Sequence, residues 1–129
     1  MILDSSVIVA IVLGEPGFET LVTAIRGEEV VGVGAPTLAE TGIVLESRLG
    51  TDSQAILDRF LRDFDVAVIP FAADHWREAV DAFRRFGRGR HRAGLNFGDC
   101  LTYATTQTSG DSLLYVGSDF SATDLSGDR

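Results

Sequence analysis

The chain opens with Met1-Ile-Leu-Asp-Ser-Ser-Val-Ile-Val-Ala10, and this stretch decides the predicted fold. Ile2 and Leu3 predict a short buried strand, and the apolar run from Val7 to Leu13 predicts a helix soon after it. Asp4 stands between the two. An Asp at the carboxyl end of a strand lies at the edge where α/β sheets bind ligands. Asp is also a good helix cap, so this position alone does not separate the two roles.

The composition is that of an ordinary globular protein, and residues 1–129 are expected to form a single domain. Apolar residues make up 45% of the chain and charged residues 23%, which is close to the average of soluble domains. The net charge is −8, and all 11 basic residues are Arg. This acidic balance argues against a passive nucleic-acid coat protein. It leaves open an enzyme that combines an acidic metal site with a local basic patch.

Cysteine usage and hydropathy predict a cytoplasmic protein that does not enter membranes. Cys100 is the one cysteine, so no intrachain disulfide can form, and a reducing compartment is expected. The N-terminus lacks the positive lead of a signal peptide, and Asp4 interrupts its apolar run. The run from Val7 to Leu13 spans seven residues, far fewer than the roughly 20 that cross a bilayer.

Strand-like and helical patterns alternate along the whole chain. Strands are predicted near residues 2–4, 29–33, 66–69 and 112–116, with helices between them. Such alternation predicts an α/β/α sandwich with a mainly parallel sheet of four or five strands and helices on both faces. In the long helix predicted over 72–86, we expect Trp76, Ala79, Val80 and Phe83 to face inward.

Three more acidic residues stand at positions like that of Asp4. Glu40 lies in the first turns of a predicted helix, Asp99 in the first turn of another, and Asp119 shortly after the last strand. Each has a structural explanation: Thr37-x-x-Glu40 matches a capping box, an acid at Asp99 suits the helix dipole, and Asp119 suits a turn. Taken together, helix starts and strand ends converge on one edge of such a sheet, so the four carboxylates are expected to meet there.

A cluster of unneutralised carboxylates raises its own pKa values by mutual repulsion, and a divalent cation removes that cost. Oxygen-only ligands favour Mg²⁺, or alternatively Mn²⁺, over zinc. These ions activate water and neutralise phosphate charge. We expect Ser6 to position a carboxylate or a phosphate oxygen, or to cap a helix. His75 and His91 match no ligand spacing and are expected at the surface.

An arginine-rich loop precedes Asp99. Five of the 11 arginines fall between Arg84 and Arg92. Those at the end of the predicted helix suit the helix dipole, but the glycine-rich segment 87–94 needs another explanation. We interpret Arg88, Arg90 and Arg92 as contacts to an RNA phosphate backbone. An acidic protein partner, or no specific partner, is the alternative.

Several stretches resemble the PIN domain, and more narrowly the VapC toxins of bacterial type II toxin–antitoxin modules. The resemblance covers essentially the whole chain. It rests on Asp4-Ser-Ser6, on Thr37-Leu-Ala-Glu40, on Gly-Arg-His-Arg-Ala-Gly-Leu-Asn-Phe-Gly-Asp99-Cys and on Leu-Leu-Tyr-Val-Gly-Ser-Asp119-Phe-Ser-Ala-Thr-Asp124. The third stretch is the most specific of the four.

The resemblance implies a Mg²⁺-dependent endoribonuclease that inhibits translation and growth and is silenced by a cognate VapB antitoxin. It implies a homodimer, a toxin–antitoxin hetero-oligomer, and operator DNA bound only through the antitoxin. The acidic positions of the family match Asp4, Glu40, Asp99 and Asp119, with Asp124 as a possible further member. We expect the apolar helices over 7–13 and 18–25 to supply much of the antitoxin groove.

Other classes of protein share an acidic cluster on an α/β sheet. A receiver domain needs a lysine beside its phosphorylated Asp, and this chain has no lysine. A haloacid-dehalogenase-type phosphatase needs Asp-x-Asp after the first strand, where this chain has Asp4-Ser5-Ser6. A non-catalytic acidic metal-binding module remains as an alternative, and metal-dependent RNA cleavage separates it from a nuclease.

Overall fold

Four parallel strands form the centre of the molecule, in the computed structural model that describes residues 1–125. They are β1 (Ile2–Leu3), β2 (Val31–Gly34), β3 (Val66–Ile69) and β4 (Leu113–Leu114), in the spatial order β3-β2-β1-β4. All three strand pairs are parallel. The sequence-based prediction of a parallel α/β sandwich is therefore confirmed, with four strands.

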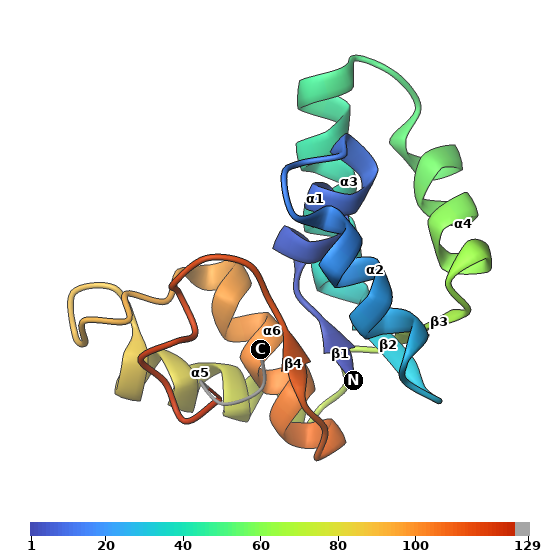
Figure 1. Ribbon diagram of the computed structural model, residues 1–129. Coiled ribbons are helices and arrows are strands. Elements are labelled where there is room, and N and C mark those ends of the chain that lie inside the picture. The colour runs from blue at the N-terminus through green and yellow to red at the C-terminus, as the bar shows by residue number, and fades with distance from the viewer. Residues whose placement is uncertain (126–129) are drawn as a thin grey trace.

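Helices cover both faces of the sheet (Figure 1). One face carries α1 (Ser5–Leu13), α2 (Phe18–Arg26), α3 (Ala35–Leu49) and α4 (Ser53–Asp63), and the other carries α5 (His75–Phe86) and α6 (Phe97–Ser109). Each face encloses its own apolar core. Leu3, Ile8 and Leu45 belong to the first core, and Tyr103 and Leu113 belong to the second.

Strand β1 is short, yet it lies in the middle of the sheet and positions Asp4. Ile2 and Asp4 donate backbone hydrogen bonds to the β4 side, and Gly32 donates to Met1 O at 2.9 Å. The Met1 amine adds an ion pair with Asp111 at 2.7 Å. The chain is thus fixed from both sides immediately before it leaves the sheet at Asp4.

The inward face of α5 differs from the predicted one. Trp76, Val80 and Phe83 are all more than 40% exposed. Of the predicted residues Ala79 is buried, and it belongs to a stripe made of His75, Ala79, Ala82 and Phe86. The helix begins at His75 rather than Ala72, and its buried residues follow the usual spacing of three and four positions.

Neither histidine is a free surface residue, so that expectation was wrong. His75 is 6% exposed, and its Nδ1 accepts a hydrogen bond from the Ala72 amide at 2.9 Å. His91 is half-buried, accepts from the Ala93 amide at 3.1 Å, and packs edge-on against Phe86. Both rings accept a hydrogen bond from a nearby backbone amide and so stabilise local turns. The spacing of histidines in the sequence does not reveal such a role.

No single helix within residues 1–125 has the length and apolar character needed to cross a membrane. Among these residues, α1 and α2 reach the length and apolar content of a membrane span only when taken together, and the chain bends by 118° between them.

Candidate active site

Asp4 is the most buried carboxylate of the candidate site. It follows β1 directly and caps α1, where its Oδ2 accepts from the Ser6 amide at 3.2 Å and from the Ser6 hydroxyl at 2.6 Å. Its side chain is held at 6% exposure. Burial raises the pKa of Asp4, and the hydrogen bonds from Ser6 and Thr102 only partly offset this. Asp4 therefore caps helix α1 and also belongs to the candidate site.

Glu40 reaches the same edge from α3. That helix begins at Ala35 behind the cap residue Gly34, so Thr37 and Glu40 do not form the capping box that their spacing matches. Burial and then the charge of Asp4 raise the pKa of Glu40, while a hydrogen bond from Ser5 lowers it. A Cβ added at Gly98 would meet Glu40 Oε2 at 2.5 Å. The glycine thus leaves room for this carboxylate beside the start of α6.

Asp99 stands in the first turn of α6 and forms a true capping box with Asn96. The Asn96 side chain accepts from the Asp99 amide at 2.8 Å, and Asp99 accepts from the Asn96 amide at 3.1 Å. Burial first, and then the charges of Asp119, Asp4 and Glu40, nevertheless raise the pKa of Asp99 to about 7, against the lowering effect of the Asn96 backbone hydrogen bond. Asp99 is therefore the residue through which all four predicted carboxylates interact.

Asp119 reaches the edge through a turn after β4. Gly117 has φ of 96°, a left-handed conformation that favours glycine. Asp119 is exposed, whereas the next residue, Phe120, is 1% exposed and packs against Tyr115. The buried ring fixes the segment, and the charge of Asp119 is near enough to raise the pKa of Asp99.

Two further side chains, which the sequence analysis did not single out, lie beside the carboxylates of the candidate site. The Thr102 hydroxyl bonds to Asp4 and lies 2.9 Å from the Thr37 hydroxyl, so a chain of hydroxyls runs from α3 to Asp4. Ser5 bonds to Glu40. Thr102 lies one helical turn after Asp99, on the same side of α6, and this spacing was the one available signal.

Asp124 does not join the carboxylate cluster. Its oxygens accept hydrogen bonds from Tyr103 at 2.9 and 3.1 Å and from Arg85 at 3.3 Å. No influence of Asp124 on the pKa of Asp4, Glu40 or Asp99 is found. Of the two late acidic residues, the structure brings Asp119 to the site.

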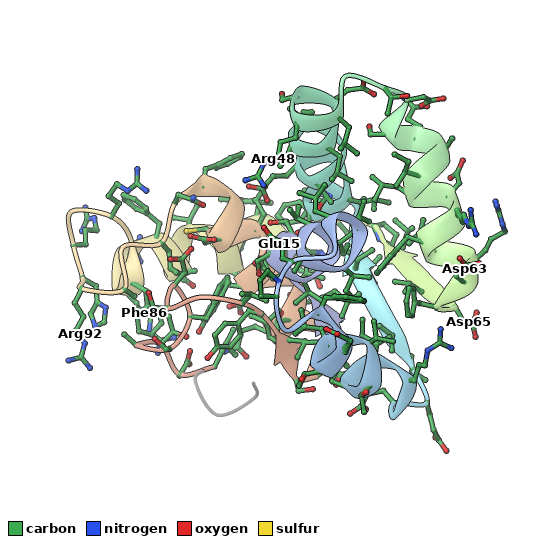
Figure 2. All side chains as sticks on the ribbon, turned by 45° about the horizontal axis from the view of Figure 1, so that its top comes forward. Glu15, Arg48, Asp63, Asp65, Phe86 and Arg92 are labelled. Carbon is green, nitrogen blue, oxygen red and sulfur yellow. The ribbon has the colours of Figure 1, made fainter. Side chains whose placement is uncertain are left out.

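The arginine loop forms a closed turn between α5 and α6. Leu95 donates to Phe86 O at 2.9 Å, and Arg88 donates to Leu95 O at 3.0 Å. Arg88, Arg90 and Arg92 are exposed. Figure 2 shows Arg92 at the outer end of the loop, pointing away from the body of the protein. The Arg90 guanidinium lies 5.4 Å from the centre of the Phe83 ring.

The donor set suits a hard divalent cation in its chemistry. Within residues 1–125, the side chains as placed form no group of three or more acidic, His or Cys ligands that could hold a metal ion. The same carboxylates nevertheless raise one another's pKa values, and a cation between them would relieve this repulsion. Oxygen donors of this kind are those that Mg²⁺ and Mn²⁺ prefer.

Comparison with known proteins gives a consistent result. The family model described as "PIN domain" matches residues 1–125. Ribonuclease VapC36 of Mycobacterium tuberculosis is 47% identical over 97% of this chain and 91% of its own length. Ribonuclease VapC of Mycolicibacterium smegmatis is 42% identical over 97% of both chains.

A solved structure agrees on the fold. The crystal structure of VapC20 of M. tuberculosis, a toxin that cleaves the sarcin–ricin loop, superposes with a TM-score of 0.75 at 22% identity. The match covers 94% of this chain and 92% of that one. The carboxylates converge on the sheet edge, and these VapC relatives are 42–47% identical to the chain. The chain therefore belongs to the PIN domain family and, within it, to the VapC ribonucleases.

Proposed function

We propose that this protein is a divalent-metal-dependent endoribonuclease that acts as the toxin of a VapBC module. The observation that carries the proposal is the coupling of Asp99 to Asp119, Asp4 and Glu40, whose charges raise its pKa together with burial. Relatives named as ribonucleases support the reaction class. Residues 1–129 would act as one cytoplasmic domain.

In this proposal, Asp4, Glu40, Asp99 and Asp119 hold Mg²⁺, or alternatively Mn²⁺. A bound ion of this kind supplies activated water and neutralises charge on the scissile phosphate. Ser6 and Thr102 hold the Asp4 carboxylate in place through the hydrogen bonds described above. These hydrogen bonds keep the Asp4 carboxylate in one orientation and partly offset the cost of burying its charge.

The arginine loop supplies the RNA contact in this proposal. The protein carries −8 overall, and salt screens charges beyond about 8 Å at physiological ionic strength. A polyanion therefore needs a local cationic surface near the site. Arg88, Arg90 and Arg92 are exposed on a loop that leads directly into Asp99, and guanidinium groups bind phosphate through paired donors.

The antitoxin surface we propose differs from the one expected from the sequence. Most apolar side chains of α1 and α2 pack into the first core, and none of the large exposed hydrophobic side chains of the described residues lies on these helices. An apolar groove of about 490 Å³ runs instead between α3 and α4 and includes Leu38, Ile43 and Leu57. A helix of the VapB antitoxin, with its apolar face inward, fits such a groove.

We also propose a homodimer, which would assemble with VapB into a hetero-oligomer that binds operator DNA through the antitoxin. The exposed apolar side chains of α5 and of Phe97, which is 80% exposed, support a partner surface there. RNA cleavage by the free toxin would inhibit translation and growth.

Sequencing of the 5′ ends of RNA fragments tests the activity. Purified protein with Mg²⁺ is expected to produce discrete new 5′ ends, and chelator is expected to abolish them. Asp99→Asn should abolish them as well, because it removes the carboxylate that couples to the other three. Asp63→Asn, which alters an exposed carboxylate on α4, is the matched control and should cleave normally. Cleavage that persists in chelator or in Asp99→Asn would reject the proposed metal site.

A further inference from the structure

The Tyr103 hydroxyl is the centre of a hydrogen-bond network that lies apart from the carboxylate cluster. Tyr103 is 1% exposed on α6, and its hydroxyl donates to Asp124 at 2.9 Å. It accepts from Arg85 Nη1 at 3.2 Å and from Gln107 Nε2 at 2.9 Å. Arg85 also forms an ion pair with Asp124 at 3.3 Å. The Asp124 carboxylate is therefore engaged by donors from both α5 and α6.

This network fastens the far end of the segment that carries Asp119. At the near end, the Val116 amide donates to the Ser6 hydroxyl at 3.0 Å, and that hydroxyl donates to Asp4. Between the two ends, the segment is held by its own bonds, including the Thr123 amide to Phe120 O at 3.1 Å. Asp119 thus lies on a short segment that is tied to the protein on both sides.

We infer that Asp124 is a positioning residue that holds Asp119 against Asp99 through Tyr103 and Arg85, and that it does not bind the metal. The inference rests on the proposed function, because Asp124 is argued to place Asp119 where Asp119 can bind the metal. Asp119 itself is exposed, so its direction depends on the anchoring of its neighbours. Both oxygens of Asp124 accept from Tyr103, and Oδ2 also accepts from Arg85, so this carboxylate is held in the Tyr103 network and not among Asp4, Glu40 and Asp99.

Calorimetric titration with Mn²⁺ tests this inference on four forms of the full chain: wild type, Asp124→Ala, Tyr103→Phe and the double variant. Each single variant is expected to weaken Mn²⁺ binding by roughly tenfold, as removal of partners outside the ligand shell does at metal sites. The double variant should be no weaker than Asp124→Ala alone, because without Asp124 the Tyr103 hydroxyl has no carboxylate to hold. RNA cleavage at saturating Mn²⁺ should return to near the wild-type rate.

Hydrogen exchange supplies a second measurement that does not need the metal. The amides of Ser121 and Thr123 bond within the segment, and both should exchange faster in Asp124→Ala and Tyr103→Phe. Asp63→Asn, which breaks the exposed Arg59–Asp63 ion pair on α4, is the control and should change neither measurement.

Two results would overturn the inference. Weakened Mn²⁺ binding in Asp124→Ala with unchanged exchange of the Ser121 and Thr123 amides would identify Asp124 as a direct ligand. Unchanged exchange and unchanged binding in both variants would show that the network does not position Asp119. If wild-type protein binds no Mn²⁺, the proposed function fails, and unchanged exchange in this segment would separately reject the positioning role.

Discussion

At the residue scale, Asp99 combines a structural role with a chemical one. Its carboxylate completes the capping box with Asn96, which holds the side chain at the start of α6. Burial and three neighbouring carboxylates raise its pKa to about 7. The sequence pattern indicated Asp99 because it stands in the first turn of a predicted helix, where both roles are compatible.

The raised pKa of Asp99 predicts how the stability of the metal-free protein depends on pH. An ordinary Asp in the unfolded chain loses its proton near pH 3.9, whereas folded Asp99 keeps it until about pH 7. Between these values the folded state binds more protons, so the free energy of unfolding should fall as pH rises. The slope from this residue is at most about 1.4 kcal/mol per pH unit.

Urea denaturation in chelator, from pH 4 to pH 8, measures this effect. Asp99→Asn, which keeps an oxygen for the capping box, should show a shallower decline and should be more stable than wild type above pH 7. Identical pH profiles for the two proteins would contradict the pKa assigned to Asp99.

The site residues that stand at ends of elements could be predicted from the sequence, and those that depend on contacts between elements could not. Asp4 and Asp99 were singled out from strand–helix boundaries. Thr102 and Ser5 were not, because their hydroxyls act across helices that the sequence does not place side by side. Asp124 had the right residue type, but Tyr103 and Arg85 engage it elsewhere.

At the scale of elements, the arginine loop is held by backbone bonds at its base, and its arginine side chains are exposed. The bonds between Leu95, Phe86 and Arg88 close the turn. The side chains of Arg88, Arg90 and Arg92 are exposed, so replacing them should leave the fold intact.

The triple variant Arg88→Ala, Arg90→Ala, Arg92→Ala is therefore expected to bind RNA more weakly. Its dependence on salt should also be flatter, by a slope of roughly 0.7 for each single-strand phosphate that the variant no longer neutralises. RNA affinity measured across a salt series gives both values. A control triple variant in the exposed arginines of α3 and α4, Arg48→Ala, Arg59→Ala, Arg62→Ala, should keep the wild-type slope. Equal slopes in all three proteins would show that the loop does not contact phosphate.

Helix positions were predicted well from sequence, but the direction of their faces was not. Helix α5 carries two neighbouring apolar stripes. The stripe with Ala79, Ala82 and Phe86 is buried, and the stripe with Trp76, Val80 and Phe83 is exposed. Both stripes have helical spacing, so the apolar pattern alone did not show which of them faces the core.

At the scale of the whole molecule, the alternation of strands and helices predicted the sandwich because parallel strands require crossover helices. The apolar content of α1 and α2 did not reveal which surface stays open. Their side chains fill the core beneath the sheet face, and the open groove lies between α3 and α4. A buried core and an open apolar groove have similar composition, so only the packed structure separates them.

The topology gives the molecule one acidic edge. Asp4 leaves β1, Asp119 follows β4, and the helices that carry Glu40 and Asp99 begin at the same end of the sheet. The central claim is that these four carboxylates form one divalent-cation site.

Anomalous diffraction from crystals soaked in Mn²⁺ tests this claim most directly. We expect an anomalous peak within direct coordination distance of carboxylate oxygens from Asp4 and Asp99, with Glu40 and Asp119 beside it, and no such peak in Asp99→Asn. A peak at another place on the protein, or none at this edge at saturating Mn²⁺, would contradict the claim.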